Sequence, residues 1–217
     1  MAKSLITTLK LQKPDIVLYS ASYETDKDQR KFIERTKRLI RNSMEYKDYI
    51  KYLRDNCDMD KCAFFQKIRK SKDNKVRIEI HHEPFTLDDI VRTVINKQMD
   101  EGVPLNDLNV ADEVMYLHYC NMVGLVPLSK TVHEMVHSDT NKIFVPLNMC
   151  YGDYREFLNQ YADFIEEDIM DRLETKIEMT RNVTEDDFAA LEAAFEYLEV
   201  EDVDLPEKVE LENSNVA

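Results

Sequence analysis

The chain has 217 residues, of which 43% are hydrophobic and 33% charged, and its formal net charge at pH 7 is −14. This composition is typical of a folded protein, and only 3 Gly and 6 Pro argue against collagen-like, linker-rich or many-turned all-β architectures. No apolar run approaches the roughly 20 residues that a membrane span needs. Lysines are scattered through residues 1–14, so no secretory signal is expected, and the four widely spaced Cys favour reduced thiols over a disulfide framework.

The charge is unevenly distributed along the chain. Residues 27–77 hold 17 Lys/Arg and 8 Asp/Glu, a net of +9, whereas residues 150–217 hold 5 Lys/Arg and 21 Asp/Glu, a net of −16. The overall acidity disfavours a nucleic-acid binder, because polyanions repel one another. The local excess of basic residues allows one end to face phosphates while the acidic end faces solvent or folds over the basic part.

The first half of the chain is predicted to mix strands and helices. Two short β-prone runs are expected over 5–11 and 15–20, followed by amphipathic helices over 26–42 and 44–54. Strands are predicted over 63–68 and 76–82, with a turn at 71–74 between them.

Beyond Pro84 the pattern becomes helical. Thr86 is the expected N-cap of a helix, with Asp89 three residues on, and a second helix is expected over 109–121. A short strand over 124–128 leads to Ser129, which is expected to cap a helix that runs through His137. One long helix is predicted over 154–179, and a last one is predicted to begin at Thr184.

The positions of the histidines are the strongest functional signal. His81 and His82 are adjacent at the end of a predicted strand, and His133 and His137 are four residues apart on a predicted helix. Residues i and i+4 project from one helix face, so the two imidazoles can chelate one divalent metal, with a strand end supplying a third ligand. Adjacent strand residues point to opposite faces. If His81 faces the metal, His82 is therefore left as a candidate general base.

These residues resemble a known family. The run IEIHHE at 78–83, followed by GLVPLSKTVHEMVH at 124–137, is similar to the HNH endonuclease motif in the His-His…His-x-x-x-His variant of the nuclease colicins. The resemblance covers roughly residues 62–138 and implies a ββα unit that holds one metal ion. Its style is also similar to that of phage-encoded HNH-like proteins.

The resemblance implies roles for the four histidines. His81, His133 and His137 would be the metal ligands, and His82 would be the general base that activates water. The ion would contact the scissile phosphate and stabilise the departing 3′ oxygen. A histidine ligand set favours zinc, nickel or manganese, with magnesium also allowed.

The chain departs from the family pattern in two places. The family has an Asn nine residues before the first helix His, where it pins the loop, and this chain has Gly124. Asn121 or His118 can take over the pinning, or the loop can be held in another way. Residues 83–123 form a long insertion that holds two predicted helices.

The remaining candidate sites are weaker. A cluster of basic residues that leads into His81 is a candidate nucleic-acid contact, and its members are Lys67, Arg69, Lys70, Lys72, Lys75 and Arg77. Cys57 and Cys62 have the wrong spacing for a zinc knuckle and are read as buried thiols. HEMVH at 133–137 also matches a zinc-protease pattern formally, but that interpretation leaves His81 and His82 without a role.

The sequence thus predicts an α+β protein with a ββα-metal (HNH-like) core embedded in a mainly helical protein. Its segments would be a basic N-terminal region (1–60), the metal-binding unit with its helical insertion (61–150) and an acidic helical region (151–217). The predicted function is metal-dependent hydrolysis of phosphodiester bonds in nucleic acid, with DNA expected, by a cytoplasmic enzyme. The alternative is a catalytically inactive interaction protein that keeps the metal as a structural staple and docks a protein partner through its acidic helices.

Overall fold

The computed structural model describes residues 23–70, 76–140, 143–187 and 189. This part of the chain is mainly helical with one antiparallel two-stranded sheet, which confirms a mixed α/β class with a helical majority. In chain order the elements are α1 (Asp26–Asn42), α2 (Met44–Asn56), β1 (Ile78–His82), α3 (Leu87–Asp100), α4 (Asp107–Tyr119), β2 (Leu125–Ser129), α5 (Lys130–Val136), α6 (Tyr154–Tyr161) and α7 (Glu167–Arg181). The β-prone runs over 5–11 and 15–20 lie outside the described residues.

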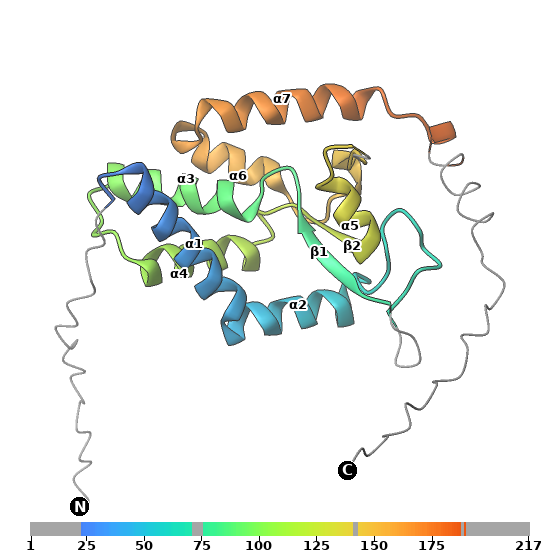
Figure 1. The fold of residues 1–217 in the computed structure, drawn as a ribbon, viewed down its shortest axis with the longest axis horizontal. Coiled ribbons are helices and arrows are strands. Elements are labelled where there is room, and N and C mark those ends of the chain that lie inside the picture. Colours follow the sequence, from blue (N-terminus) through green and yellow to red (C-terminus); the bar gives the residue numbers. More distant parts are fainter. Residues whose placement is uncertain (1–22, 71–75, 141–142, 188, 190–217) are drawn as a thin grey trace, which may run out of the picture.

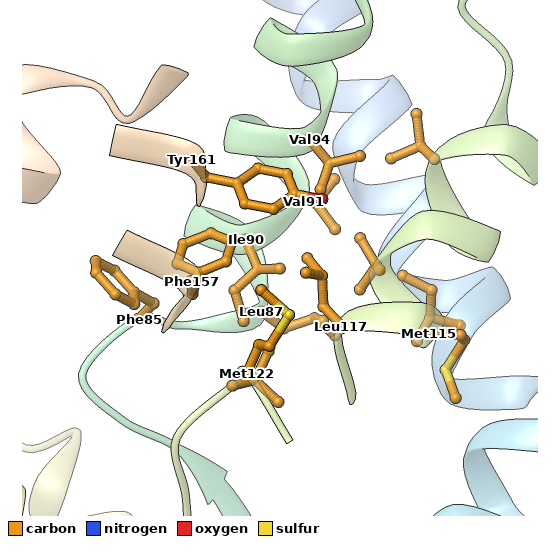
Figure 2. Packing of buried hydrophobic residues seen from close by; sticks show 14 of the residues in the cluster. Phe85, Leu87, Ile90, Val91, Val94, Met115, Leu117, Met122, Phe157 and Tyr161 are labelled. Atoms are coloured by element: carbon orange, nitrogen blue, oxygen red, sulfur yellow. The ribbon is translucent and has the colours of Figure 1, made fainter. Parts of the chain in front are cut away.

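Side chains of α1, α2, α3, α4, α6 and α7 form the main hydrophobic core. Figure 1 shows how these helices are arranged. Helix α3 presents apolar side chains at helical spacing, including Ile90, Val91 and Val94, toward α4 and α6 (Figure 2). The ring of Phe157 in α6 is stacked on that of Tyr161, with centroids 5.0 Å apart. The capping box that Thr86 forms with Asp89 begins α3, as the sequence predicts.

The sheet joins two segments that are far apart in sequence. Strands β1 and β2 pair antiparallel with His81 opposite Val126 and His82 opposite Leu125, and the insertion that separates them holds α3 and α4. Helix α5 follows β2 directly, because Ser129 ends the strand and its side chain accepts a hydrogen bond from the Val132 amide. The result is a strand–strand–helix unit beside the helical body (Figure 1).

This unit has a small core of its own. Residues of β1, β2 and α5 pack there against the segment before β1, and the buried members are Cys62, Phe64, Phe65, Ile78, Val126, Leu128, Val132 and Val145. The prediction of a strand over 63–68 is wrong. The backbone turns instead, with the Ile68 amide bonded to the Phe65 carbonyl, and the consecutive Phe64 and Phe65 both enter one core, which an alternating strand does not allow.

The prediction of one continuous helix over 154–179 is also wrong. The chain forms α6, a 3₁₀ turn at Ala162–Phe164 and then α7. Side chains of α3 stabilise the turn between α6 and α7, because Asn96 donates a hydrogen bond to the Phe164 carbonyl at 3.0 Å and Arg92 pairs with Glu166. These tertiary contacts override the continuous apolar spacing of the sequence.

The main core includes residues from all three predicted segments. Phe32 lies in 1–60, Ile90 in 61–150 and Leu173 in 151–217, and all three belong to one buried cluster. The three segments therefore share packing in the described part of the chain, and their division into separate units stays a prediction.

Candidate metal centre

Three of the four predicted site histidines converge. One ring nitrogen each of His81, His133 and His137 lies within 4.8 Å of the others. The ring centroids of His133 and His137 are 4.8 Å apart, and each is 5.2 Å from the centroid of His81. Within the described residues, no other group of three or more His, Cys, Asp or Glu side chains converges in this way.

Strand and helix periodicity together explain the convergence. Glu79 and His81 are two residues apart on β1, so both point to the face of the sheet that α5 covers. Helix α5 starts at Lys130, and the spacing of four residues then brings His133 and His137 onto this same side. His137 is the C-cap residue, so it lies at the open end of the helix.

Two carboxylates orient the cluster. The Oε2 atom of Glu79 lies 2.7 Å from Nδ1 of His133, and Oε2 of Glu83 lies 3.2 Å from Nε2 of His81. An ionised carboxylate only accepts hydrogen bonds, so these ring nitrogens donate, and the lone pairs fall on Nε2 of His133 and Nδ1 of His81. Carboxylates commonly orient metal-ligating histidines in this way. Glu79 was not predicted as a site residue, although its position two residues before His81 was the available signal.

The donor set suits a divalent ion. The Nε2 atoms of His133 and His137 are 3.3 Å apart. Two imidazole nitrogens that bind one tetrahedral ion at about 2.0–2.1 Å would lie about 3.3 Å apart, so the observed spacing matches chelation. His81 is buried and His137 is exposed, which leaves one side of the cluster accessible. Three protein ligands with an accessible side are the layout of a catalytic rather than a structural metal site.

His82 lies on the opposite face of β1 and is not part of this cluster. Its Nε2 atom is 3.0 Å from Nε2 of His118, a residue of α4 that the structure buries completely. Burial lowers the pKa of His82 well below its usual value, and the neighbouring His118 and His81 add to the effect. Burial likewise lowers the pKa of His118 to about 4, so both rings are neutral at pH 7.

The hydrogen bonds of this pair define its tautomers. His118 Nδ1 lies 2.7 Å from the Val114 carbonyl, which only accepts, so Nδ1 carries the proton. Nε2 of neutral His118 then has the lone pair and accepts from Nε2–H of His82. The lone pair of His82 is left on Nδ1, the atom that would receive a proton if His82 acts as a base. That role stays a prediction.

The backbone holds the loop at Gly124. The Glu83 amide donates to the Gly124 carbonyl at 3.0 Å, and Leu125 exchanges two backbone bonds with Tyr151. A Cβ atom on residue 124 would lie 1.8 Å from the Glu83 carbonyl oxygen, so only glycine allows this approach. Of the predicted alternatives, Asn121 contributes its carbonyl to the Asp153 amide, and His118 contacts the strand end through His82.

A cavity of about 640 Å³ opens beside the cluster, between β1, α5 and α7. His81 and His137 line it, and His82 does not. Helix α7 is fastened over this region, since Lys176 pairs with Glu83 and donates to the Pro84 carbonyl at 3.1 Å. Arg172 of the same helix pairs with Asp89 at 2.6 Å.

The structure describes four of the six residues that were predicted to contact nucleic acid. Lys67, Arg69, Lys70 and Arg77 are exposed, whereas Lys72 and Lys75 lie outside the described residues. Arg69 forms ion pairs with Asp58 and Asp60, and the Arg77 carbonyl accepts from the first amide of α5. The four cysteines are free thiols, with Cys62 buried and Cys57 half-buried.

A family model described as "Bacteriophage G278-like virion protein" matches residues 3–209. The chain belongs to this family. Comparison with curated proteins and with solved structures gives no match. Membership of the G278-like virion protein family supports the phage origin that the histidine pattern suggested, and it leaves the nuclease prediction untested. Within the described residues, no helix is both long and apolar enough to cross a bilayer.

Proposed function

We propose that this G278-like virion protein is a metal-dependent endonuclease of the HNH type. The observation that carries the proposal is the convergence of His81, His133 and His137 on a strand–strand–helix unit. The order of the elements and the histidine at each position agree with the motif that the sequence resembles. The orienting carboxylate of Glu79 adds a feature of metal centres that chance clustering would not require.

Each histidine has a role in the proposed reaction. His81, His133 and His137 hold one divalent ion, for which nitrogen donors favour zinc, nickel or manganese over magnesium. Such an ion supplies Lewis-acid stabilisation of the negative charge on the phosphate and the leaving oxygen. His82 is the proposed general base that would take a proton from the attacking water; because its ring lies on the face of β1 opposite the cluster and does not line the cavity, this role requires the side chain to turn away from His118 toward the ion.

The proposed substrate is nucleic acid, with DNA as the preferred form because the chain belongs to a phage family. The exposed Lys67, Lys70 and Arg77 are proposed to contact phosphates outside the centre. The proposed location is the cytoplasm of the host cell, as expected for a phage-encoded protein. The acidic α7 is proposed to face a protein partner.

One observation favours a second function. The family is described as a virion protein, which fits a particle component that uses the ion only as a staple between β1 and α5. In that case chelation lowers the melting temperature and no divalent ion supports cleavage.

A plasmid-nicking assay separates the two functions. Purified protein is tested with Zn²⁺, Ni²⁺, Mn²⁺ and Mg²⁺, beside His82→Ala and His137→Ala, and bound metal is measured in each sample. The nuclease proposal expects nicking by the parent chain, loss of nicking with retained metal in His82→Ala, and loss of both in His137→Ala. Nicking by His82→Ala at the parent rate contradicts the general-base assignment, and absence of nicking with every ion contradicts the nuclease.

A further inference from the structure

The cavity beside the histidine cluster has an apolar part and a polar part. The apolar part is formed by α5, α7 and the segment between α5 and α6, and its residues are Val136, Ile143, Phe144, Val145 and Met179. The polar part includes Glu83, Thr86, Thr175 and Lys176. Its volume of about 640 Å³ is that of a small-molecule site.

The charges around the cavity are nearly balanced without an ion. Lys176 is neutralised by Glu83, and Arg172 by Asp89, while Asp171 adds a negative charge. A divalent ion on three neutral imidazoles would place two positive charges at one end of the cavity. An anionic group is therefore expected to bind at the histidine end, and to bind only when the ion is present.

The rest of the cavity suits a flat apolar ring. Phe144 is half-buried and lines the cavity among aliphatic side chains, so its ring can stack with a planar heterocycle. A nucleotide combines such a heterocycle with an anionic phosphate. A paired base inside a duplex is stacked on both faces and cannot enter.

We propose that this cavity binds one nucleotide of an unpaired nucleic-acid strand, with its phosphate at His81 and His137 and its base against Phe144. The inference rests on the proposed function and specifies its substrate as single-stranded or locally unpaired.

The first test measures binding to the full chain loaded with Zn²⁺ by calorimetry. The ligands are deoxyadenosine 5′-monophosphate, deoxyribose 5-phosphate and deoxyadenosine, so that base and phosphate are separated. The monophosphate is expected to bind about tenfold more tightly than deoxyribose 5-phosphate, as expected for one stacked base, and chelation by EDTA is expected to abolish its binding. Equal affinity for the two phosphates overturns the proposal.

Two variants with matched controls locate the site. Phe144→Ala is expected to weaken binding of the monophosphate about tenfold and to leave the affinity for deoxyribose 5-phosphate unchanged. The control Tyr52→Ala removes an exposed aromatic ring of α2 and is expected to change neither affinity. Thr175→Glu adds a carboxylate at the cavity and is expected to weaken binding of both phosphate ligands. The control Asn159→Glu adds the same charge on α6, outside the cavity, and is expected to leave both affinities unchanged. If Phe144→Ala does not fold, Thr175→Glu still tests the site. Unchanged binding of both phosphate ligands by Thr175→Glu contradicts the proposal.

The strand preference is measured with His82→Ala, which is expected to bind without cutting. A fluorescein-labelled single strand is expected to bind more tightly than the duplex of the same sequence, and equal or tighter binding of the duplex overturns the inference. Base-dependent binding without any nicking would contradict the nuclease proposal and support the nucleotide site. Nicking without base-dependent binding would contradict the nucleotide site and support the nuclease proposal.

Discussion

Glu79 is a side chain outside the proposed ligand set that contacts one of its histidines. It fixes which nitrogen of His133 carries the proton and so directs Nε2 toward His137. Replacing it with Ala should lower zinc affinity about 10- to 100-fold, because His133 loses its orientation. Competition with a chromophoric chelator measures this, with Glu45→Ala on the exposed face of α2 as the control. Equal zinc affinity in Glu79→Ala and the parent would show that the carboxylate has no orienting role.

The pairing of His82 with His118 makes a prediction about tautomers. His82 is expected to be neutral with its proton on Nε2, because Nε2 of His118 can only accept. Long-range ¹H–¹⁵N correlation spectra at pH 7 distinguish the two tautomers by their nitrogen shifts. When His118→Phe removes the acceptor, part of the population should carry the His82 proton on Nδ1 instead of Nε2. A parent spectrum with the proton on Nδ1 of His82 would contradict this tautomer assignment.

The low pKa of His118 makes folding sensitive to acid. Burial lowers this pKa from 6.5 to about 4, so below pH 6.5 the unfolded chain binds a proton that the folded chain does not. The stability from neutral His118 is fully present above pH 6.5 and is lost as pH falls toward 4. Between pH 7 and pH 5 the loss should be about 2 kcal/mol.

His118→Gln tests this dependence. Urea unfolding in EDTA at pH 7 and pH 5 should show a smaller loss of unfolding free energy in the variant than in the parent. EDTA is needed because histidine protonation also releases a bound ion. Parallel pH curves for parent and variant would mean that His118 does not titrate below its ordinary pKa in the folded protein.

At the scale of elements, the junction of β1 and β2 depends on Gly124. A side chain there would meet the Glu83 carbonyl, so Gly124→Ala should destabilise the fold by at least about 3 kcal/mol, the cost of severe overpacking. Gly102→Ala is the matched control, because Gly102 has a φ of +67° but nothing within 4 Å of an added Cβ. It should cost about 1 kcal/mol. Thermal unfolding of both variants measures the difference, and equal losses would contradict the close approach.

Local signals in the sequence were sufficient to predict several elements. Helix α1 has the predicted bounds of 26–42, Thr86 caps α3, and Ser129 caps α5. Caps and apolar spacing are properties of neighbouring residues, so a single sequence carries them. The convergence of His133 and His137 follows from helical spacing in the same way. That His81 joins them was a hypothesis from strand periodicity, and the geometry agrees with it.

Features that depend on distant contacts were not predictable. The bond between His82 and His118 joins residues 36 apart, and the break before α7 depends on Asn96 and Arg92 of α3. The turn at 63–68 depends on burial of both Phe64 and Phe65. The close approach at Gly124 likewise requires Glu83, the residue that follows β1. Each depends on tertiary packing, which overrides local propensity.

At the scale of the molecule, the helical body and the strand–strand–helix unit share β1. One face of this strand directs Glu79 and His81 toward α5, and the other directs His82 toward α4. Helix α7 connects the two parts again, through Arg172 to Asp89 and Lys176 to Glu83. The proposed centre therefore lies where the helical body and the sheet unit meet, and residues of the acidic α7 line the cavity beside it.

The proposed metal centre requires that His81, His133 and His137 hold one divalent ion. Substitution with Co²⁺ tests it directly, because the visible absorption of cobalt reports both stoichiometry and coordination geometry. Titration of the EDTA-treated, dialysed chain should saturate at one ion per chain with the intense absorption of a tetrahedral site, and His81→Ala, His133→Ala and His137→Ala should each weaken or abolish it. A parent chain that binds no cobalt, or a chain with all three histidines replaced by Ala that binds cobalt as the parent does, would contradict this centre.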